Sequence, residues 1–168
     1  LEPNRGHVVS AFTRDDIADI FWLQATIATE IAANAARRIT EPAIAELDRL
    51  MAKEPNNPGY CSLKAAALAR IGEYAQSIDL YATVLKQYPQ QAKVWMSYGH
   101  SLKTAGRPAE SIDAYRRCIE LTPGLCEAYW SLANLKTYRF DDAEIEQMRQ
   151  FEDLPTTALE DRYHLCFA

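Results

Sequence analysis

Three prolines recur at a fixed interval in this chain of 168 residues. Pro55, Pro89 and Pro123 are 34 positions apart, and Gly72 and Gly106 share the same interval. Proline cannot continue a helix, and glycine readily takes the left-handed conformation in which many helices end. A period of about this length is typical of stacked helical hairpins. The sequence therefore predicts an all-α fold, an α-α superhelix in which helical hairpins form a right-handed solenoid.

The same period predicts how the chain is divided. Residues 1–12 show no helical spacing of apolar side chains, so we expect a poorly ordered lead-in there. A single helical array is expected over 13–168, with a degenerate repeat over 13–55, repeats over 58–89 and 92–123, a divergent repeat over 126–155 and a truncated helix over 157–168. The degenerate repeat is expected to have one long helix from Thr13 to about Arg38, and Thr40 is expected to cap its second helix.

The composition argues against several classes of protein. The net charge is −5 and the pI is about 5.2, whereas a protein that binds nucleic acid through its phosphates carries a basic face. No run approaches the roughly 18 apolar residues that a membrane-spanning helix needs, and the N-terminus does not resemble a signal peptide. The four cysteines form no CxxC pair. We interpret them as reduced thiols, which favours a cytoplasmic location.

The unit over 92–123 carries the clearest motif. Its key positions are Trp95, Tyr98, Gly99, Leu102, Ser111, Tyr115 and Pro123. This spacing resembles the tetratricopeptide repeat, whose pattern is W-x2-L-G-x2-Y, then A-x3-F, then P. The unit over 58–89 gives a weaker match through Cys61, Lys64, Ala65, Leu68, Ser77, Tyr81 and Pro89. The resemblance implies a non-enzymatic scaffold that binds a peptide or partner domain in a concave groove, with small residues where two helices approach closely.

A second resemblance covers residues 128–168. The string AYWSLANLKTYRFDDAEIEQM, followed by EDRYHL, is similar to the segment that links repeats to catalytic domain in bacterial tetratricopeptide-repeat sulfotransferases. It implies an alternative function, in which these helices present an acceptor substrate to, or pack on, a C-terminal catalytic domain of the same parent chain. No glycine-rich loop with a Lys or Arg that could cradle a phosphate group occurs among the 168 residues.

The concave face of such an array is lined by the first helix of each hairpin, so outward residues there are candidate ligand contacts. The candidates are Arg70, Lys93, Met96, His100, Lys103, Glu127, Trp130, Asn134 and Tyr138. Our hypothesis is a groove for an extended or helical peptide of acidic character, held by Lys93, His100, Lys103 and Asn134, with Trp130 as an apolar anchor. The alternative is that these side chains are solvated or face a neighbouring domain.

No residue set indicates catalysis, a cofactor or a metal. His7, His100 and His164 have no nucleophile or carboxylate partner at a recognisable spacing. Asp141 and Asp142 are explained as caps of a helix that follows a first helix over roughly 126–137. The chain is therefore expected not to be an enzyme and to need no cofactor.

The start of the predicted first helix is apolar nearly all round, because Phe21, Trp22 and Leu23 are consecutive. A helix of this kind buries its surface against another element. Homo-oligomerisation through the N-terminal helix is therefore a further possibility.

Overall fold

The computed structural model describes residues 13, 14, 22 and 40–168. The chain divides into two units, Leu1–Ile39 and Thr40–Ala168, and the second unit is described by itself below. The expected lead-in and most of the predicted helix from Thr13 to about Arg38 lie outside the described residues. The oligomerisation hypothesis, which rests on that helix, stays a prediction.

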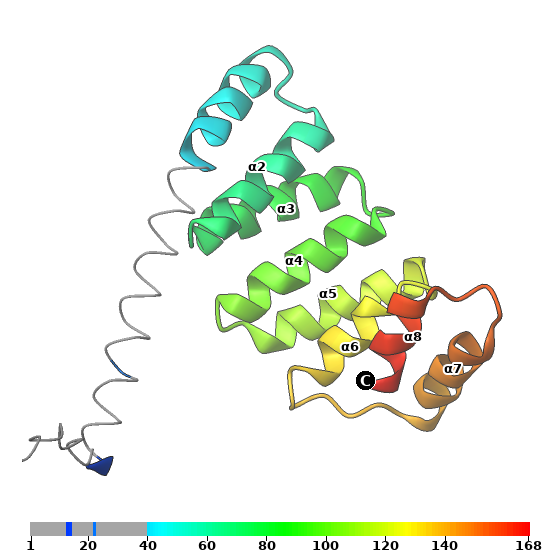
Figure 1. Cartoon of the computed structure of the whole chain (residues 1–168). Coiled ribbons are helices and arrows are strands. Elements are labelled where there is room, and N and C mark those ends of the chain that lie inside the picture. The colour runs from blue at the N-terminus through cyan, green and yellow to red at the C-terminus, as the bar shows by residue number, and fades with distance from the viewer. Residues whose placement is uncertain (1–12, 15–21, 23–39) are drawn as a thin grey trace, which may run out of the picture. The chain divides into compact units, whose positions relative to one another are not determined.

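The second unit consists of helices joined by short loops (Figure 1). In chain order they are the helical residues 40–53, α2 (Pro58–Arg70), α3 (Tyr74–Gln87), α4 (Ala92–Thr104), α5 (Pro108–Leu121), α6 (Glu127–Ala133), α7 (Asp142–Asp153) and α8 (Leu159–Cys166). The described residues contain no strand, and the predicted all-α class is confirmed. Thr40, predicted to precede its helix as the cap, is already helical and only 6% exposed, so that helix begins no later than Thr40.

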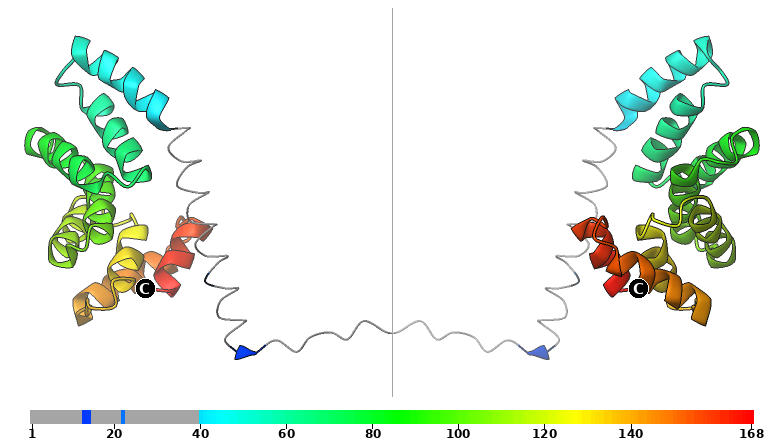
Figure 2. Two further views of the ribbon diagram at one scale, coloured as in Figure 1. Left: turned by 90° about the vertical axis from the view of Figure 1, so that its left-hand side faces the viewer. Right: turned by 90° about the vertical axis from the view of Figure 1, so that its right-hand side faces the viewer.

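The turns inside the two regular hairpins have the predicted chemistry. Gly72 and Gly106 have φ angles of +90° and +76°, a region that strains any residue with a Cβ. Asn57 caps α2, because its side chain accepts hydrogen bonds from the backbone N–H groups of Gly59 and Tyr60 at 3.0 and 3.3 Å. These local signals give α2–α3 and α4–α5 their hairpin shape, and Figure 2 shows the hairpins stacked in chain order.

Within the second hairpin the two helices cross at Gly99. A Cβ added to Gly99 would lie 2.6 Å from a ring carbon of Tyr115, which is fully buried. The hydroxyl of Ser111 donates a hydrogen bond of 2.9 Å to the Gly99 carbonyl. Small residues at the crossing therefore allow the close approach that the motif predicts.

Neighbouring hairpins are joined by contacts between their helices. The hydroxyls of Ser77 in α3 and Ser101 in α4 lie 3.1 Å apart and are buried, and Ile78 packs with Leu102 in one apolar cluster. Lys64, which stands where the motif has an apolar residue, pairs with Asp48 of the helical residues 40–53. Lys64 therefore links the helical residues 40–53 to α2.

The C-terminal helices depart from the hairpin plan. The first helix of the divergent repeat, predicted to reach about Thr137, ends at Ala133 in α6. Leu135, Tyr138 and Phe140, which follow it, pack on a buried cluster instead of continuing a helix. α8 packs against both α6 and α7, and all three helices share a buried cluster of Cys126, Tyr129, Met148 and Leu165.

Candidate functional site

A groove of about 510 Å³ lies between α2, α3 and α4. It is lined by Ala66, Ala69, Arg70, Tyr74, Tyr81, Ser97, His100, Ser101 and Thr104. α2 and α4 are the first helices of consecutive hairpins, which is where the repeat architecture places a concave surface. We call this hollow the α2–α4 groove.

The lining of the α2–α4 groove is rich in hydroxyl groups and contains no carboxylate, although the chain as a whole is acidic. Arg70 contributes a cation at the end of α2, and Lys103 lies close enough to His100 to act on its charge. A second hollow, of about 340 Å³ between α5 and α7, contains both Glu120 and Glu144. The second hollow also contains Arg116, so its lining has one cation and two carboxylates, whereas the lining of the α2–α4 groove has one cation and no carboxylate. Of these two hollows, the α2–α4 groove is the better suited to an anionic group.

His100, which lines the α2–α4 groove, is held by contacts from two further helices. Its Nδ1 lies 2.8 Å from the hydroxyl of Tyr115 in α5, and its Nε2 lies 3.5 Å from a carboxylate oxygen of Glu127 in α6. Burial lowers the pKa of His100, and the charge of Lys103 lowers it further, while Glu127 raises it. The imidazole is thus fixed in orientation and is kept mainly neutral.

Two buried phenols near the groove also stay neutral. Burial raises the pKa of Tyr115 to about 12 and raises the pKa of Tyr81, which lines the groove. Their hydroxyls act as hydrogen-bonding groups at neutral pH. Tyr81, Ser97 and Thr104 line the groove and give it hydroxyl groups, whereas the hydroxyl of Tyr115 is fully buried and is used by His100.

The structure corrects one of the predicted contacts. Met96, predicted to face the groove, is only 5% exposed and packs with Tyr115, Ala128 and Leu132. The physical reason is that the side of α4 that carries Met96 packs into one apolar cluster with side chains of α5 and α6, and is therefore buried. Met96 therefore belongs to the core and cannot contact a ligand.

The remaining candidates are distributed over separate places. Arg70 and His100 line the α2–α4 groove, and Lys103 is half-buried on the same helix as His100. Lys93 is exposed at the start of α4, and Asn134 is exposed at the end of α6. The structure therefore brings together only part of the predicted set.

The two aromatic candidates contact the C-terminal helices. The ring of Trp130 lies 5.8 Å from that of His164 in α8. Tyr138 donates a hydrogen bond of 2.5 Å to Glu144 in α7, and its ring packs edge-on against Phe140 at 5.1 Å. Both side chains help to attach the last helices to the array.

The sequence reasoning missed the hydroxyl residues of the groove. Ser97, Ser101 and Thr104 follow one face of α4 at helical spacing, next to His100. That spacing is a usable signal, because small polar residues that recur at helical spacing mark a face of α4 distinct from its apolar stripe. Among the described residues, no group of three His, Cys, Asp or Glu side chains could hold a metal ion. In the same part of the chain, no helix is long and apolar enough to cross a bilayer.

Comparison with known proteins shows a repeat at the centre of this array. Residues 92–124 match the family model described as tetratricopeptide repeat. Among curated proteins, the small glutamine-rich tetratricopeptide repeat-containing protein 2 of Mycosarcoma maydis is 36% identical over 69 residues, covering 41% of this chain and 20% of that protein. A peroxisomal targeting signal receptor of Kluyveromyces lactis is 30% identical over 93 residues, covering 51% of this chain and 16% of the receptor.

Solved structures share the arrangement of helices. A crystal structure of MamA superposes with a TM-score of 0.57 at 16% identity, covering 95% of this chain and all of that one. The Thermobaculum terrenum O-GlcNAc transferase mutant K341M superposes with a TM-score of 0.58 at 20% identity, covering 84% of this chain and 27% of the transferase. At these identities the likeness shows the fold alone. The chain is thus an all-α solenoid containing a tetratricopeptide repeat, and it spans a fifth or less of the curated relatives it matches.

Proposed function

We propose that this chain is a protein-interaction scaffold whose α2–α4 groove binds a peptide segment or a partner domain. Relatives with related repeats include receptors whose name states that they recognise a targeting signal, which supports a polypeptide ligand here. The proposal assigns binding, not catalysis, to the groove residues and needs no cofactor. A cytoplasmic location is part of the same proposal.

The observation that carries the proposal is the lining of this groove, which contains Arg70 and no carboxylate in an acidic chain. The Glu127 carboxylate contacts the lining residue His100 from α6 but does not itself line the groove. Arg70 at the end of α2 supplies positive charge to the lining.

The hydroxyls of Ser97 and Thr104 donate to the carbonyls of Lys93 and His100, and their oxygens can accept hydrogen bonds from the N–H groups of a peptide backbone. An acidic side chain on the ligand would gain a charge-assisted hydrogen bond from Arg70. The ligand is therefore an extended or helical peptide of acidic character.

Fluorescence anisotropy with three labelled peptides of equal length tests this proposal. The peptides carry glutamates, lysines or serines at the same alternating positions. We expect the glutamate peptide to bind at least tenfold more tightly than the lysine peptide, and Arg70→Glu to weaken it by about tenfold. Lys86→Glu is the matched control, because Lys86 is exposed on α3 and does not line the groove. Equal binding of all three peptides would reject the proposal.

A second candidate function rests on the sequence of residues 128–168 and its likeness to tetratricopeptide-repeat sulfotransferases. In that function the helices would hold an acceptor polypeptide for a catalytic domain in the same parent protein. The packing of α8 on α6 and α7 supports a defined C-terminal surface on which a further domain would rest. Co-expression with a sulfotransferase domain from the parent gene, followed by a test for complex formation, distinguishes the two candidates.

A further inference from the structure

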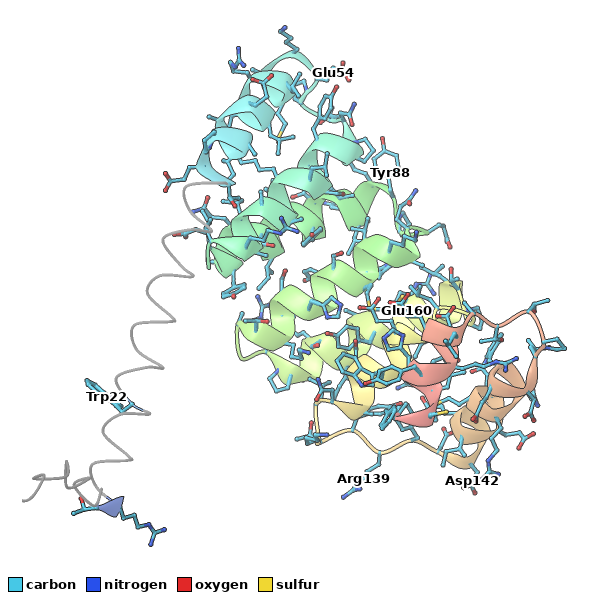
Figure 3. All side chains as sticks on the ribbon, viewed as in Figure 1. Trp22, Glu54, Tyr88, Arg139, Asp142 and Glu160 are labelled. Carbon is cyan, nitrogen blue, oxygen red and sulfur yellow. The ribbon has the colours of Figure 1, made fainter. Side chains whose placement is uncertain are left out.

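His100 lines the α2–α4 groove and also contacts two helices that do not line it. Its Nδ1 lies 2.8 Å from the Tyr115 hydroxyl in α5, and its Nε2 lies 3.5 Å from a carboxylate oxygen of Glu127 in α6. Side chains of α4, α5 and α6 meet in the space between these helices (Figure 3). The side chain of His100 is 37% exposed. The imidazole is therefore fixed from inside the array, while its charge can act on a ligand in the groove.

The hydrogen bonds of His100 can serve both of its protonation states. In the neutral imidazole, Nδ1 accepts from the Tyr115 hydroxyl and Nε2 carries the proton that faces Glu127. When Nδ1 takes up a proton, it donates to the Tyr115 oxygen, and the phenol then donates elsewhere. The hydroxyls of Ser111 and Ser131 lie close enough to lower the pKa of Tyr115. Ser131 is fully buried and has no other hydrogen-bond partner among the described residues, so its oxygen can accept this proton.

Several charged and titratable side chains surround His100. Those that line the groove with it, contact it or act on its charge are Arg70 of α2, Tyr74 and Tyr81 of α3, Lys103 of α4 itself, Tyr115 of α5 and Glu127 of α6. Burial and Lys103 hold the pKa of His100 below its ordinary value of 6.5 in the chain without ligand, although Glu127 raises it. Uptake of a proton would add a second cation to a lining that holds Arg70 and no carboxylate.

We propose that an acidic peptide in the α2–α4 groove binds together with a proton, which His100 takes up at Nδ1. This inference rests on the proposed function and adds the regulation of the same site. A ligand carboxylate beside the imidazole stabilises the imidazolium and so raises the pKa of His100. Because the two equilibria are linked, a peptide that raises this pKa must itself bind more tightly as the pH falls. The affinity of the groove for acidic segments therefore rises from neutral to mildly acidic pH.

Fluorescence anisotropy with the glutamate and serine peptides at pH 7.5 and pH 5.5 tests this inference. Glutamate side chains have an ordinary pKa of about 4.3, so those of the peptide stay mainly ionised over this range. We expect the glutamate peptide to bind about fivefold more tightly at pH 5.5 and the serine peptide to bind equally at both pH values. His100→Gln is expected to abolish the rise. His164→Gln is the matched control and is expected to keep it, because His164 packs on Trp130 and does not line the groove.

An NMR titration of the Cε1–H signal of His100 gives a readout that does not depend on affinity. The pKa of His100 is expected to be higher with a saturating glutamate peptide than in the free chain. Selective binding of the glutamate peptide that does not change with pH, an unchanged pKa of His100, or an equal rise in His100→Gln would overturn this inference and leave the proposed function standing. Equal binding, or no binding, of the glutamate, serine and lysine peptides at both pH values would reject both.

Discussion

The hairpins α2–α3 and α4–α5 and the C-terminal helices α6–α8 bring their helices into contact in different ways. In the hairpins, glycine turns and small crossing residues bring two helices into close contact. In the C-terminal region, α6 is short, Lys136 takes a left-handed conformation with φ of +64°, and α8 supplies the packing. Backbone geometry at the glycines therefore sets the helix packing of the two hairpins. In the C-terminal region, side chains that pack on neighbouring helices set it.

The largest expected effect concerns the helix crossing in the regular part. Gly99→Val places a Cβ 2.6 Å from a ring carbon of buried Tyr115, so we expect a loss of about 2–3 kcal/mol in the free energy of unfolding. Urea unfolding followed by circular dichroism measures it. The control is Gly124→Ala before α6, where the nearest contact of a new Cβ is 3.8 Å and the expected change is within about 0.5 kcal/mol. Equal losses would contradict the proposed difference between the regions.

Two buried tyrosines sharpen the comparison through their hydroxyls. Tyr115→Phe removes the 2.8 Å partner of His100 and is expected to lower the free energy of unfolding by about 1–2 kcal/mol. The Tyr129 hydroxyl is also buried but has no hydrogen-bond partner among the described residues. Tyr129→Phe is therefore expected to be neutral or stabilising. Thermal unfolding of both variants tests this, and a larger loss for Tyr129→Phe would refute it.

The helix ends give a smaller effect of opposite sign in the two regions. Gly106→Ala forces a Cβ into a φ of +76° and is expected to cost about 1 kcal/mol. Lys136→Gly relieves the same conformation and is expected to stabilise by only about 0.5 kcal/mol, because glycine loses more freedom on folding. Midpoints of urea unfolding report both changes. Destabilisation by Lys136→Gly would show that the lysine side chain itself holds the end of α6.

The smallest effect is a dependence of stability on pH that comes from the centre of the array. Burial lowers the pKa of His100 in the folded chain below its ordinary value of 6.5. At pH values between the lowered pKa and 6.5, the unfolded chain therefore binds more protons than the folded chain. His100 therefore contributes stability above pH 6.5 that is lost as the pH falls from 6.5 to its lowered pKa. Unfolding midpoints between pH 8 and pH 5 are expected to fall less for His100→Gln than for the parent chain. Identical slopes for the two chains would contradict this.

The 34-residue period allows much of the fold to be predicted, because its signals are local. Pro89 and Gly106 each impose a backbone conformation that does not depend on distant residues, and Gly99 belongs to the same repeat motif. The end of α6 could not be predicted, because it depends on Tyr138 and Phe140 packing on a core made by α4, α5 and α6. Local patterns therefore predict the regular hairpins better than the C-terminal region.

The candidate site is predicted less well, because α4 contributes side chains both to the buried core and to the groove. Met96 and His100 are four residues apart on α4, yet one is buried against α6 and the other lines the groove. Trp130 is predicted as an apolar anchor for a ligand, but its contact is His164, a residue more than thirty positions later. Exposure on a repeat helix is set by the next helices along the chain, and their placement is not encoded in the spacing of one helix.

The central claim is that the α2–α4 groove binds an acidic peptide. Its most direct test is a two-dimensional ¹H–¹⁵N NMR titration of the chain with the glutamate peptide. We predict that chemical-shift changes concentrate on Arg70, Ser97, His100 and Thr104, and that Arg70→Glu removes them. Changes centred on α8, or on the hollow between α5 and α7, would contradict the claim.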